Sequence, residues 1–262
     1  MNTHEYLDRI GYAGEATPTR KALGALQEAH LLSVPFENLD IHAGIPILLD
    51  LPRLYKKVVQ MRRGGFCYEL NGLFHWLLTE LGFQTRLLMG RVYDKSRGTY
   101  GQEFDHLLCM TELGGRNWLV DVGYGDFAMH PLEFSLDRPL ADANGTFLFE
   151  GDTDGYYRVS RYSTEENRYI PEYCFSLKGR RLSEFSGMCV YHQTSALSSF
   201  TRSKVCSIAT ATGRVTLTDN RLIITDNGTR TESRINGRQE FNDALFRYFN
   251  IHWSDPIVEE TT

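Results

Sequence analysis

An apolar repeat with a helical period is the clearest pattern along the chain, and it follows residue 65. The apolar positions are Phe66, Leu70, Leu73, Phe74, Leu77, Leu78 and Leu81. They lie three and four residues apart, which is the spacing of one face of a helix. Gly82 then supplies a C-terminal stop signal. The pattern predicts a helix that begins near Cys67 and ends before Gly82.

Shorter repeats of the same period make the first 83 residues mainly helical. They predict helices near residues 6–10, over residues 18–31 and over residues 52–61. Thr17 is the expected N-cap of the second helix, and Pro18 its first residue. A break is expected near Pro35, because proline disfavours helical backbone at the residue before it.

From residue 84 the apolar residues follow the alternating period of strands. The predicted strands cover residues 86–93, 106–113, 116–122, 146–149, 156–162, 205–210, 214–218 and 221–225. Turn signals at 219–220 and 226–228 separate the last of these, residues 239–249 predict a closing helix, and residues 259–262 a frayed end. Helices followed by many short strands indicate an α+β protein with a β-rich middle, in the form of a small barrel.

Composition and charge narrow the classes of function. The chain has 262 residues, of which 42% are hydrophobic, so it can bury a large core. A net charge of −5 argues against a nucleic-acid or anionic-membrane partner. We find no apolar run of membrane-spanning length and no signal peptide. Five cysteines without a CxxC pair indicate free thiols in a reducing, cytoplasmic compartment, with no metal site.

The hairpin around Gly114-Gly115 brings a histidine near an aspartate. If the two glycines form a two-residue turn, Leu108 faces Asp121 and His106 faces Gly123. His106 and Asp121 are then diagonal neighbours on one face, about 7–8 Å apart at Cα, and their side chains can meet. A three-residue loop would change this register, so the inference depends on the turn.

Cys67 is the candidate nucleophile. It is expected in the first turn of its helix, where free N–H groups and the helix dipole favour a negative sulfur. Such a thiol should have a lowered pKa, and the thiolate is the reactive form. An imidazole oriented by a carboxylate can take the thiol proton, so Cys67, His106 and Asp121 together form a possible catalytic triad. Packing is the expected role of the remaining cysteines, Cys109, Cys174, Cys189 and Cys206.

Several motifs resemble those of the arylamine N-acetyltransferase family, in its shorter form without the eukaryotic insertion. They are Arg63-Gly64-Gly65-Phe66-Cys67-Tyr68-Glu69-Leu70-Asn71, Pro35-Phe36-Glu37-Asn38-Leu39, His106-Leu107-Leu108 and Val120-Asp121-Val122-Gly123-Tyr124-Gly125. Residues 6–12 and 192–200 also match, so the resemblance covers nearly the whole chain. It implies a cysteine-proteinase-like fold: a helical bundle over residues 1–83, a β-barrel over 84–190 and an α/β lid over 191–262.

The resemblance also implies a reaction and its residues. The triad of the family maps onto Cys67, His106 and Asp121, and an ion pair that braces the catalytic helix maps onto Arg63 and Glu37. The implied reaction is acetyl transfer from acetyl-CoA to arylamines, arylhydroxylamines or arylhydrazines, as in xenobiotic metabolism. Acetyl-CoA is a co-substrate here, and a homodimer is left open.

The resemblance further implies the residues that bind the two substrates. Those expected at CoA are the backbone at Phe104 and Asp105 and the side chains of Tyr191 and Ser199. Those expected at the acceptor are Phe36, Tyr124 and Phe127, since aromatic walls suit a flat aryl group. Ala196 and Leu197 depart from the residues usual in the family beside the CoA site.

Two alternatives use the same residues differently. A papain- or transglutaminase-like cysteine hydrolase has the same order of cysteine, histidine and aspartate, with water or another amine as the acceptor. A non-catalytic binding module could keep the fold while its cysteine stays an ordinary thiol. The rate at which Cys67 reacts with iodoacetamide near neutral pH would separate such a module from an enzyme.

Overall fold

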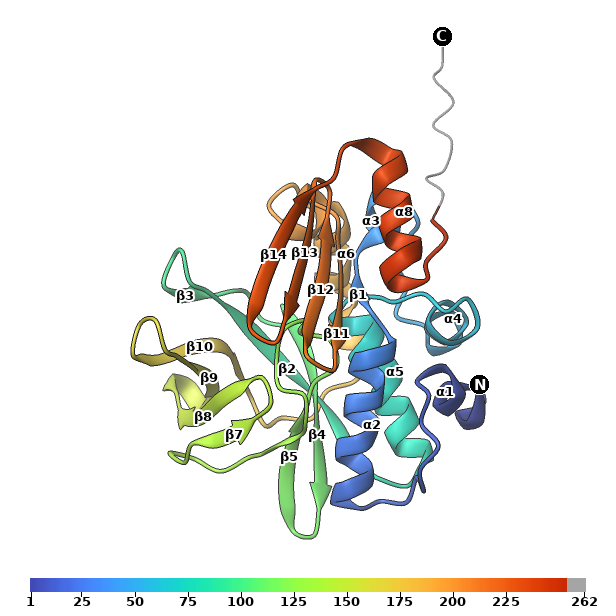
Figure 1. Ribbon diagram of the computed structural model, residues 1–262. Coiled ribbons are helices and arrows are strands. Elements are labelled where there is room, and N and C mark those ends of the chain that lie inside the picture. The colour runs from blue at the N-terminus through green and yellow to red at the C-terminus, as the bar shows by residue number, and fades with distance from the viewer. Residues whose placement is uncertain (254–262) are drawn as a thin grey trace.

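A computed structural model describes residues 1–253 of the chain. Helices from the first third of the sequence pack between two β-sheets, one built from the middle of the chain and one from its last quarter (Figure 1). Both the mixture of helices and strands and their order agree with the predicted α+β class. The frayed end predicted at residues 259–262 lies outside the described residues.

Helices occupy most of the first 80 residues. They are α1 (Thr3–Arg9), α2 (Arg20–Ser33), α3 (Leu39–His42), α4 (Leu51–Tyr55), the π-helical turn η1 (Lys56–Gln60) and α5 (Cys67–Glu80). Helix α5 begins and ends where its apolar repeat predicts. The cap predicted for α2 is wrong by two residues, because the Thr19 hydroxyl accepts the Ala22 N–H at 3.2 Å and leaves Pro18 outside the helix.

The break predicted near Pro35 is a short strand, β1 (Phe36–Glu37). It pairs antiparallel with β11 (Val205–Thr210), placing Phe36 opposite Ser207. Phe36 also forms an isolated bridge with Gly65, two residues before α5. The start of the Cys67 helix is therefore tied to a strand far along the chain.

The middle of the chain forms a curved sheet. Its strands are β2 (Gln84–Asp94), β3 (Thr99–Tyr100), β4 (His106–Leu113), β5 (Arg116–Val120), β6 (Leu132–Glu133), β7 (Leu140–Asp142), β8 (Gly145–Gly151), β9 (Tyr157–Ser163) and β10 (Arg168–Phe175). They are hydrogen-bonded in the order β6-β5-β4-β2-β10-β9-β8-β7, with β3 paired to β2. A turn of 3-10 helix, η2 (Thr153–Gly155), joins β8 to β9.

The sequence pattern missed β10, which lies between β2 and β9. Pro171 interrupts its alternation, and a bulge falls between Pro171 and Tyr173. The small edge strands β3, β6 and β7 were also missed, because two or three residues are too few to show a period.

The hairpin register predicted from the two glycines is confirmed. Cys109 faces Val120 and Leu113 faces Arg116 across the β4–β5 pair. Gly114 and Gly115 have φ values of 60° and 72°, the left-handed pair that a two-residue type I′ turn requires. Strand β5 ends at Val120, so Asp121 lies just beyond it and not within the strand as predicted.

The last quarter of the chain builds the second sheet. Its strands β11, β12 (Gly213–Thr218), β13 (Arg221–Asp226) and β14 (Thr229–Arg234) follow β1 in that order across the sheet. Helix α8 (Gly237–Phe249) packs on β11 and β12. Three short helices precede β11 in the chain: η3 (Leu182–Phe185), α6 (Ser186–Thr194) and α7 (Ser199–Arg202). Strand β14 was missed because all six of its residues are exposed, and an exposed strand has no apolar alternation.

Three apolar clusters hold these parts together. One joins the N-terminal helices to β2 and β4, one fills the curved sheet, and one lies between the second sheet and α8. Helix α5 belongs to the first cluster and packs against β4 and β2, so Cys67 is brought to the strand that begins with His106. The domain limits at residues 83 and 190 stay a prediction; the second falls within α6.

His30 on α2 is a fully buried titratable group in the first cluster. Neither of its ring nitrogens has a hydrogen-bond partner among the described residues. Its ring packs against Phe74 and Tyr6, with centroid distances of 5.2 and 6.0 Å. Burial lowers the pKa of His30 from 6.5 to about 3, so the ring is neutral in the folded protein.

We predict that His30 makes the fold sensitive to acid. Because its pKa is lower in the folded than in the unfolded state, its contribution is complete above pH 6.5 and is lost as pH falls toward about 3. The slope reaches about 1.4 kcal/mol per pH unit. His30→Leu should flatten the free energy of unfolding over this range, measured by urea denaturation. The exposed His4→Leu is the control, and an unchanged slope in His30→Leu would contradict the prediction.

Candidate active site

Cys67 is the first residue of α5, and only 3% of it is exposed. The backbone at Gly123, after β5, packs directly against Cys67. A Cβ added at Gly123 would lie 2.8 Å from the Cys67 Cα, which no real side chain tolerates. The glycine thus allows the segment that follows Asp121 to lie against the start of the Cys67 helix.

His106 and Asp121 meet as the hairpin register predicts. The His106 Nε2 lies 2.7 Å from the Asp121 Oδ2, and both side chains are buried. The Tyr173 hydroxyl donates to the same oxygen at 3.1 Å. Asp121 Oδ1 accepts from the Gly123 N–H at 2.9 Å and from the side-chain amide of Asn71 at 2.8 Å. Four donors therefore surround one buried carboxylate.

Asn71 joins the helix to the hairpin. It lies one turn after Cys67 on α5, and besides Asp121 its amide nitrogen donates to the Leu107 carbonyl at 2.6 Å. Its amide oxygen accepts the Val122 N–H at 2.9 Å. Sequence reasoning did not select Asn71, although its position four residues after Cys67 places both side chains on one helix face. It missed Tyr173 as well, because it missed β10.

Burial has the largest effect on the pKa of the Cys67 thiol. The backbone N–H of Leu107 donates to the sulfur, which places Cys67 beside the residue that follows His106. Burial raises the pKa of the thiol, the Leu107 N–H lowers it, and the Asp105 and Asp121 carboxylates raise it further. The net direction is opposite to that predicted from the helix terminus.

Comparisons with known proteins identify the family of the chain. The family described as N-acetyltransferase matches residues 19–258. Arylamine N-acetyltransferase 2 of Mus musculus is 32% identical over 280 aligned positions, which cover 98% of this chain and 97% of the relative. The chain belongs to the arylamine N-acetyltransferase family.

Solved structures of the arylamine N-acetyltransferase family share the fold. The enzyme from Salmonella typhimurium matches with a TM-score of 0.90 and 26% identity, over 98% of this chain and 93% of that one. The Mycobacterium marinum enzyme, solved in complex with CoA, matches with a TM-score of 0.87 and 28% identity, over 96% and 93%. The fold that the resemblance implies is confirmed.

Other kinds of site find no support in the described residues. No three histidine, cysteine, aspartate or glutamate side chains of residues 1–253 gather in a way that could hold a metal ion. None of the described helices is long and apolar enough to cross a membrane. All five cysteines, which lie within this range, are free and buried.

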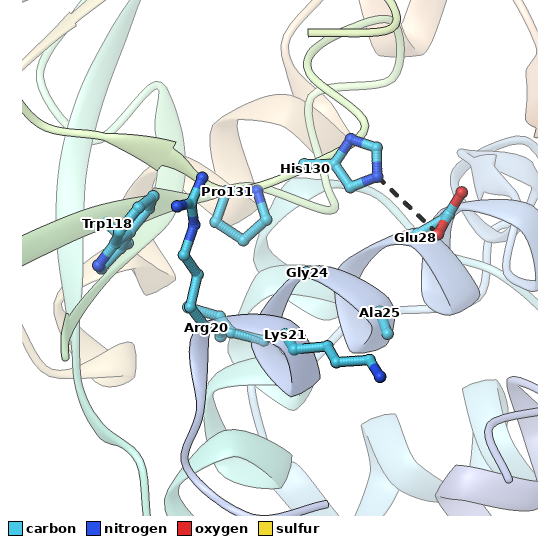
Figure 2. A pocket seen from close by; sticks show the side chains of 9 residues that line it. Arg20, Lys21, Gly24, Ala25, Glu28, Trp118, His130 and Pro131 are labelled. Carbon is cyan, nitrogen blue, oxygen red and sulfur yellow. Dashed lines mark ion pairs between the residues drawn. The ribbon is translucent and has the colours of Figure 1, made fainter. Parts of the chain in front are cut away.

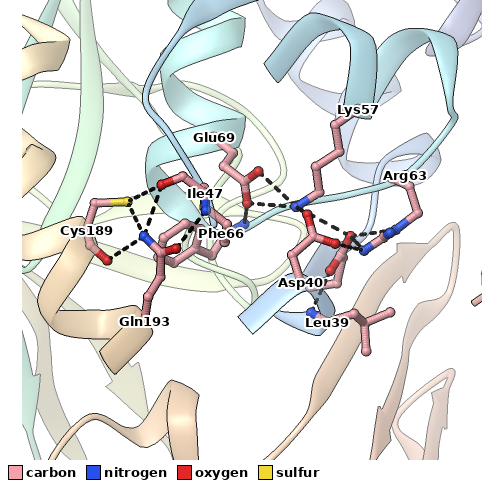
Figure 3. A network of polar contacts seen from close by, with 10 residues as sticks. Leu39, Asp40, Ile47, Lys57, Arg63, Phe66, Glu69, Cys189 and Gln193 are labelled. Carbon is pink, nitrogen blue, oxygen red and sulfur yellow. Dashed lines mark hydrogen bonds and ion pairs between the residues drawn. The ribbon is translucent and has the colours of Figure 1, made fainter. Parts of the chain in front are cut away.

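A buried network of charges supports the N-terminus of α5 (Figure 3). Arg63 Nη2 lies 2.8 Å from Glu37 and 2.8 Å from Asp40, so the ion pair implied by the family resemblance is present. Lys57 joins it, with its Nζ 2.8 Å from both Asp40 and Glu69. Glu69 in turn accepts the Phe66 N–H at 3.1 Å, which connects the network to the residue before Cys67.

The network holds three carboxylates and two cations, so its formal charges do not balance. Glu69, which is 1% exposed, is the group most affected. Burial raises the pKa of Glu69 to about 7 and outweighs the lowering by Lys57, with Glu37 adding to the rise. Loss of either cation would leave more buried negative charge without a partner.

The three predicted acceptor residues lie in two places. The Tyr124 ring is 5.3 Å from the His106 ring, and its hydroxyl donates to Glu172. Phe127 packs behind Tyr124 at 5.6 Å and belongs to the core of the curved sheet, so little of it is exposed. Phe36 lies on β1, near the start of α5, with its ring 6.0 Å from Phe200.

The predicted CoA residues also form two groups. Phe104 and Asp105 precede His106, and the Tyr68 hydroxyl donates to the Phe104 carbonyl at 2.7 Å and to the Asp105 carbonyl at 3.3 Å. Tyr191 is half-buried on α6, and Ser199 is the exposed first residue of α7. An ion pair between Asp105 and His192 on α6 brings the two groups together, and sequence reasoning did not select His192.

We predict that removal of Arg63 destabilises the protein strongly. Arg63→Ala should lower the free energy of unfolding by about 3–5 kcal/mol, because two buried carboxylates lose one of their two cationic partners. Urea denaturation at neutral pH measures the change. Arg53→Ala, at an exposed position nearby, is the matched control. A loss for Arg63→Ala no larger than that of the control would show that the network adds nothing to stability.

Proposed function

We propose that Cys67, His106 and Asp121 transfer an acetyl group from acetyl-CoA to the nitrogen or oxygen of arylamines, arylhydroxylamines and arylhydrazines. One observation carries the assignment of the residues: His106 and Asp121 form a buried pair at 2.7 Å, and the residue after His106 donates to the Cys67 sulfur. The family to which the chain belongs supports acetyl transfer over the hydrolase and binding-module alternatives.

In the first half-reaction Cys67 takes the acetyl group. Because Nε2 of His106 is bound to Asp121, Nδ1 is the nitrogen that accepts the thiol proton. The sulfur attacks the carbonyl carbon of the thioester, and the bond from that carbon to the CoA sulfur breaks. His106 returns the proton to the leaving CoA thiolate. Backbone N–H groups at the start of α5 are the proposed donors to the tetrahedral oxyanion.

In the second half-reaction the amine attacks the acetyl-Cys67 carbonyl. Nδ1 of His106 accepts a proton from the amine nitrogen, and the bond from the acetyl carbon to the Cys67 sulfur breaks. The thiolate recovers that proton, so the enzyme returns to its starting state. Two displacements through one intermediate predict ping-pong kinetics.

Substrate contacts follow from the residues around the triad. We propose that the backbone at Phe104 and Asp105, together with Tyr191 and Ser199, lines the path of CoA. Tyr124, beside His106, is the strongest candidate for contact with the aryl group. Phe127 supports Tyr124 from behind, and Phe36 is proposed to face the acceptor from the β1 side. A cytoplasmic location and a homodimer also stay predictions, for which fractionation and light scattering are the measurements.

We predict that brief exposure to acetyl-CoA adds one acetyl group to Cys67. The measurement is mass spectrometry of the intact protein and of its peptides, without any amine present. Cys67→Ala should gain no acetyl group and lose turnover, while Cys189→Ala, which removes another buried free cysteine, should still be acetylated. Acetylation of Cys67→Ala at the wild-type level would contradict the assigned nucleophile.

A second prediction concerns Asp121→Asn. An amide in this position would present an N–H to the His106 Nε2, which favours the tautomer with its proton on the wrong nitrogen. Turnover should fall by about 100-fold or more, because general-base catalysis is lost. Thermal denaturation should show a folded protein. Wild-type turnover in this variant would remove Asp121 from the mechanism.

A further inference from the structure

A carboxylate outside the triad lies close to the nucleophile. Asp105 stands directly before His106, and its charge raises the pKa of the Cys67 thiol. Its Oδ2 accepts the Val92 N–H at 3.3 Å, so the side chain is held against β2. A negative charge here opposes the thiolate on which acetyl transfer depends. Some other group must offset it.

His192 on α6 is the side chain placed to do so. Its Nε2 lies 3.2 Å from the Asp105 Oδ1, and its Nδ1 lies 3.1 Å from the Ser198 hydroxyl. Nε2 makes no hydrogen bond within residues 1–253, although it lies within ion-pair distance of Asp105. The imidazole is buried, with its ring 6.0 Å from that of Tyr68.

Ser198 allows the ring of His192 to be charged. The Ser198 hydroxyl already accepts the Phe200 N–H at 3.2 Å, and its second lone pair is free to accept an Nδ1–H. With both ring nitrogens protonated, His192 faces a carboxylate on one side and a hydroxyl oxygen on the other.

The same loop is strained, and it is clamped from two sides. Phe104 has a φ of 64°, a left-handed conformation that is costly for a bulky side chain. Tyr68, next to Cys67 on α5, holds the Phe104 carbonyl, and His192 holds the side chain of Asp105. The loop leads directly into His106, so these two contacts help to determine the position of its catalytic imidazole.

We propose that His192 is a positioning residue for acetyl transfer: it holds Asp105, and with it the loop before His106, and it offsets the Asp105 charge beside Cys67. This proposal rests on the proposed function of the triad. The titratable groups that act on the thiol are Asp105, Asp121, Cys189 and Tyr68. Of the carboxylates among them, Asp121 has His106 as its partner and Asp105 has His192.

The test compares His192→Gln, Asp105→Asn and the double variant. Two rates are measured against pH: acetylation of Cys67 by acetyl-CoA in a single turnover, and alkylation of Cys67 by iodoacetamide. His192→Gln should lower both rates about tenfold at neutral pH and move their profiles to higher pH, as one pKa unit would. Asp105→Asn in the His192→Gln background should restore the rates, because the charge that needs an opposing cation is gone.

An exposed histidine elsewhere on the molecule supplies the control. His130 also contacts an aspartate, with its Nδ1 3.0 Å from Asp142, and it lines a pocket of about 590 Å³ with Arg20, Glu28 and Trp118 (Figure 2). None of the triad residues lines this pocket. His130→Gln makes the same chemical change there and should leave both profiles unchanged.

The outcomes separate the two proposals. If the losses in His192→Gln and Asp105→Asn multiply in the double variant, or if His192→Gln leaves both profiles in place, His192 has no such role. If wild-type Cys67 is never acetylated, the proposed function itself fails. The alkylation profile then still reports whether His192 affects the thiol.

Discussion

The hydrogen bonds around the Asp121 carboxylate are the contact on which the rest of the site depends. Asn71 reaches this group from α5, His106 from β4, Tyr173 from β10, and Gly123 from the segment after β5. Helix and sheet therefore meet at one buried charge. A buried carboxylate with all its donors in place defines a unique geometry, whereas one with a missing donor is costly.

Burial and reactivity oppose each other at Cys67. The helix terminus favours a thiolate, but removal from water favours the neutral thiol more strongly. In the proposed mechanism a base that accepts the thiol proton removes this conflict. The position of a thiol at a helix terminus therefore does not by itself predict its pKa, because burial and neighbouring groups also contribute.

The sequence predicted those parts of the fold that are governed by local patterns. The Cys67 helix, the β4–β5 register and the strands β11 to β13 follow from periodicity and from paired glycines. Strands β10 and β14 could not be found, because one carries a proline and a bulge and the other is wholly exposed. The helix break at Pro35 was visible, but its pairing with β11 joins residues about 170 positions apart, and no local pattern encodes it.

The same limit applies to the site. Cys67, His106 and Asp121 could be predicted from the sequence, because a helix start positions the first and a recognisable hairpin turn positions the other two. Asn71 could have been found from its spacing to Cys67. His192 could not, because its contact with Asp105 depends on how α6 docks onto a loop of the curved sheet. The imbalance of the Lys57 and Arg63 network was equally hidden, since its members come from four separate segments.

The pairing of β1 with β11 has a consequence for synthesis of the chain. Phe36 bridges both Gly65, just before α5, and a strand that begins only at Val205. A nascent chain that ends after the curved sheet would already contain Cys67, His106 and Asp121. Its segment at Phe36 would still lack a partner strand, so maturation of the enzyme waits for translation to reach its last quarter.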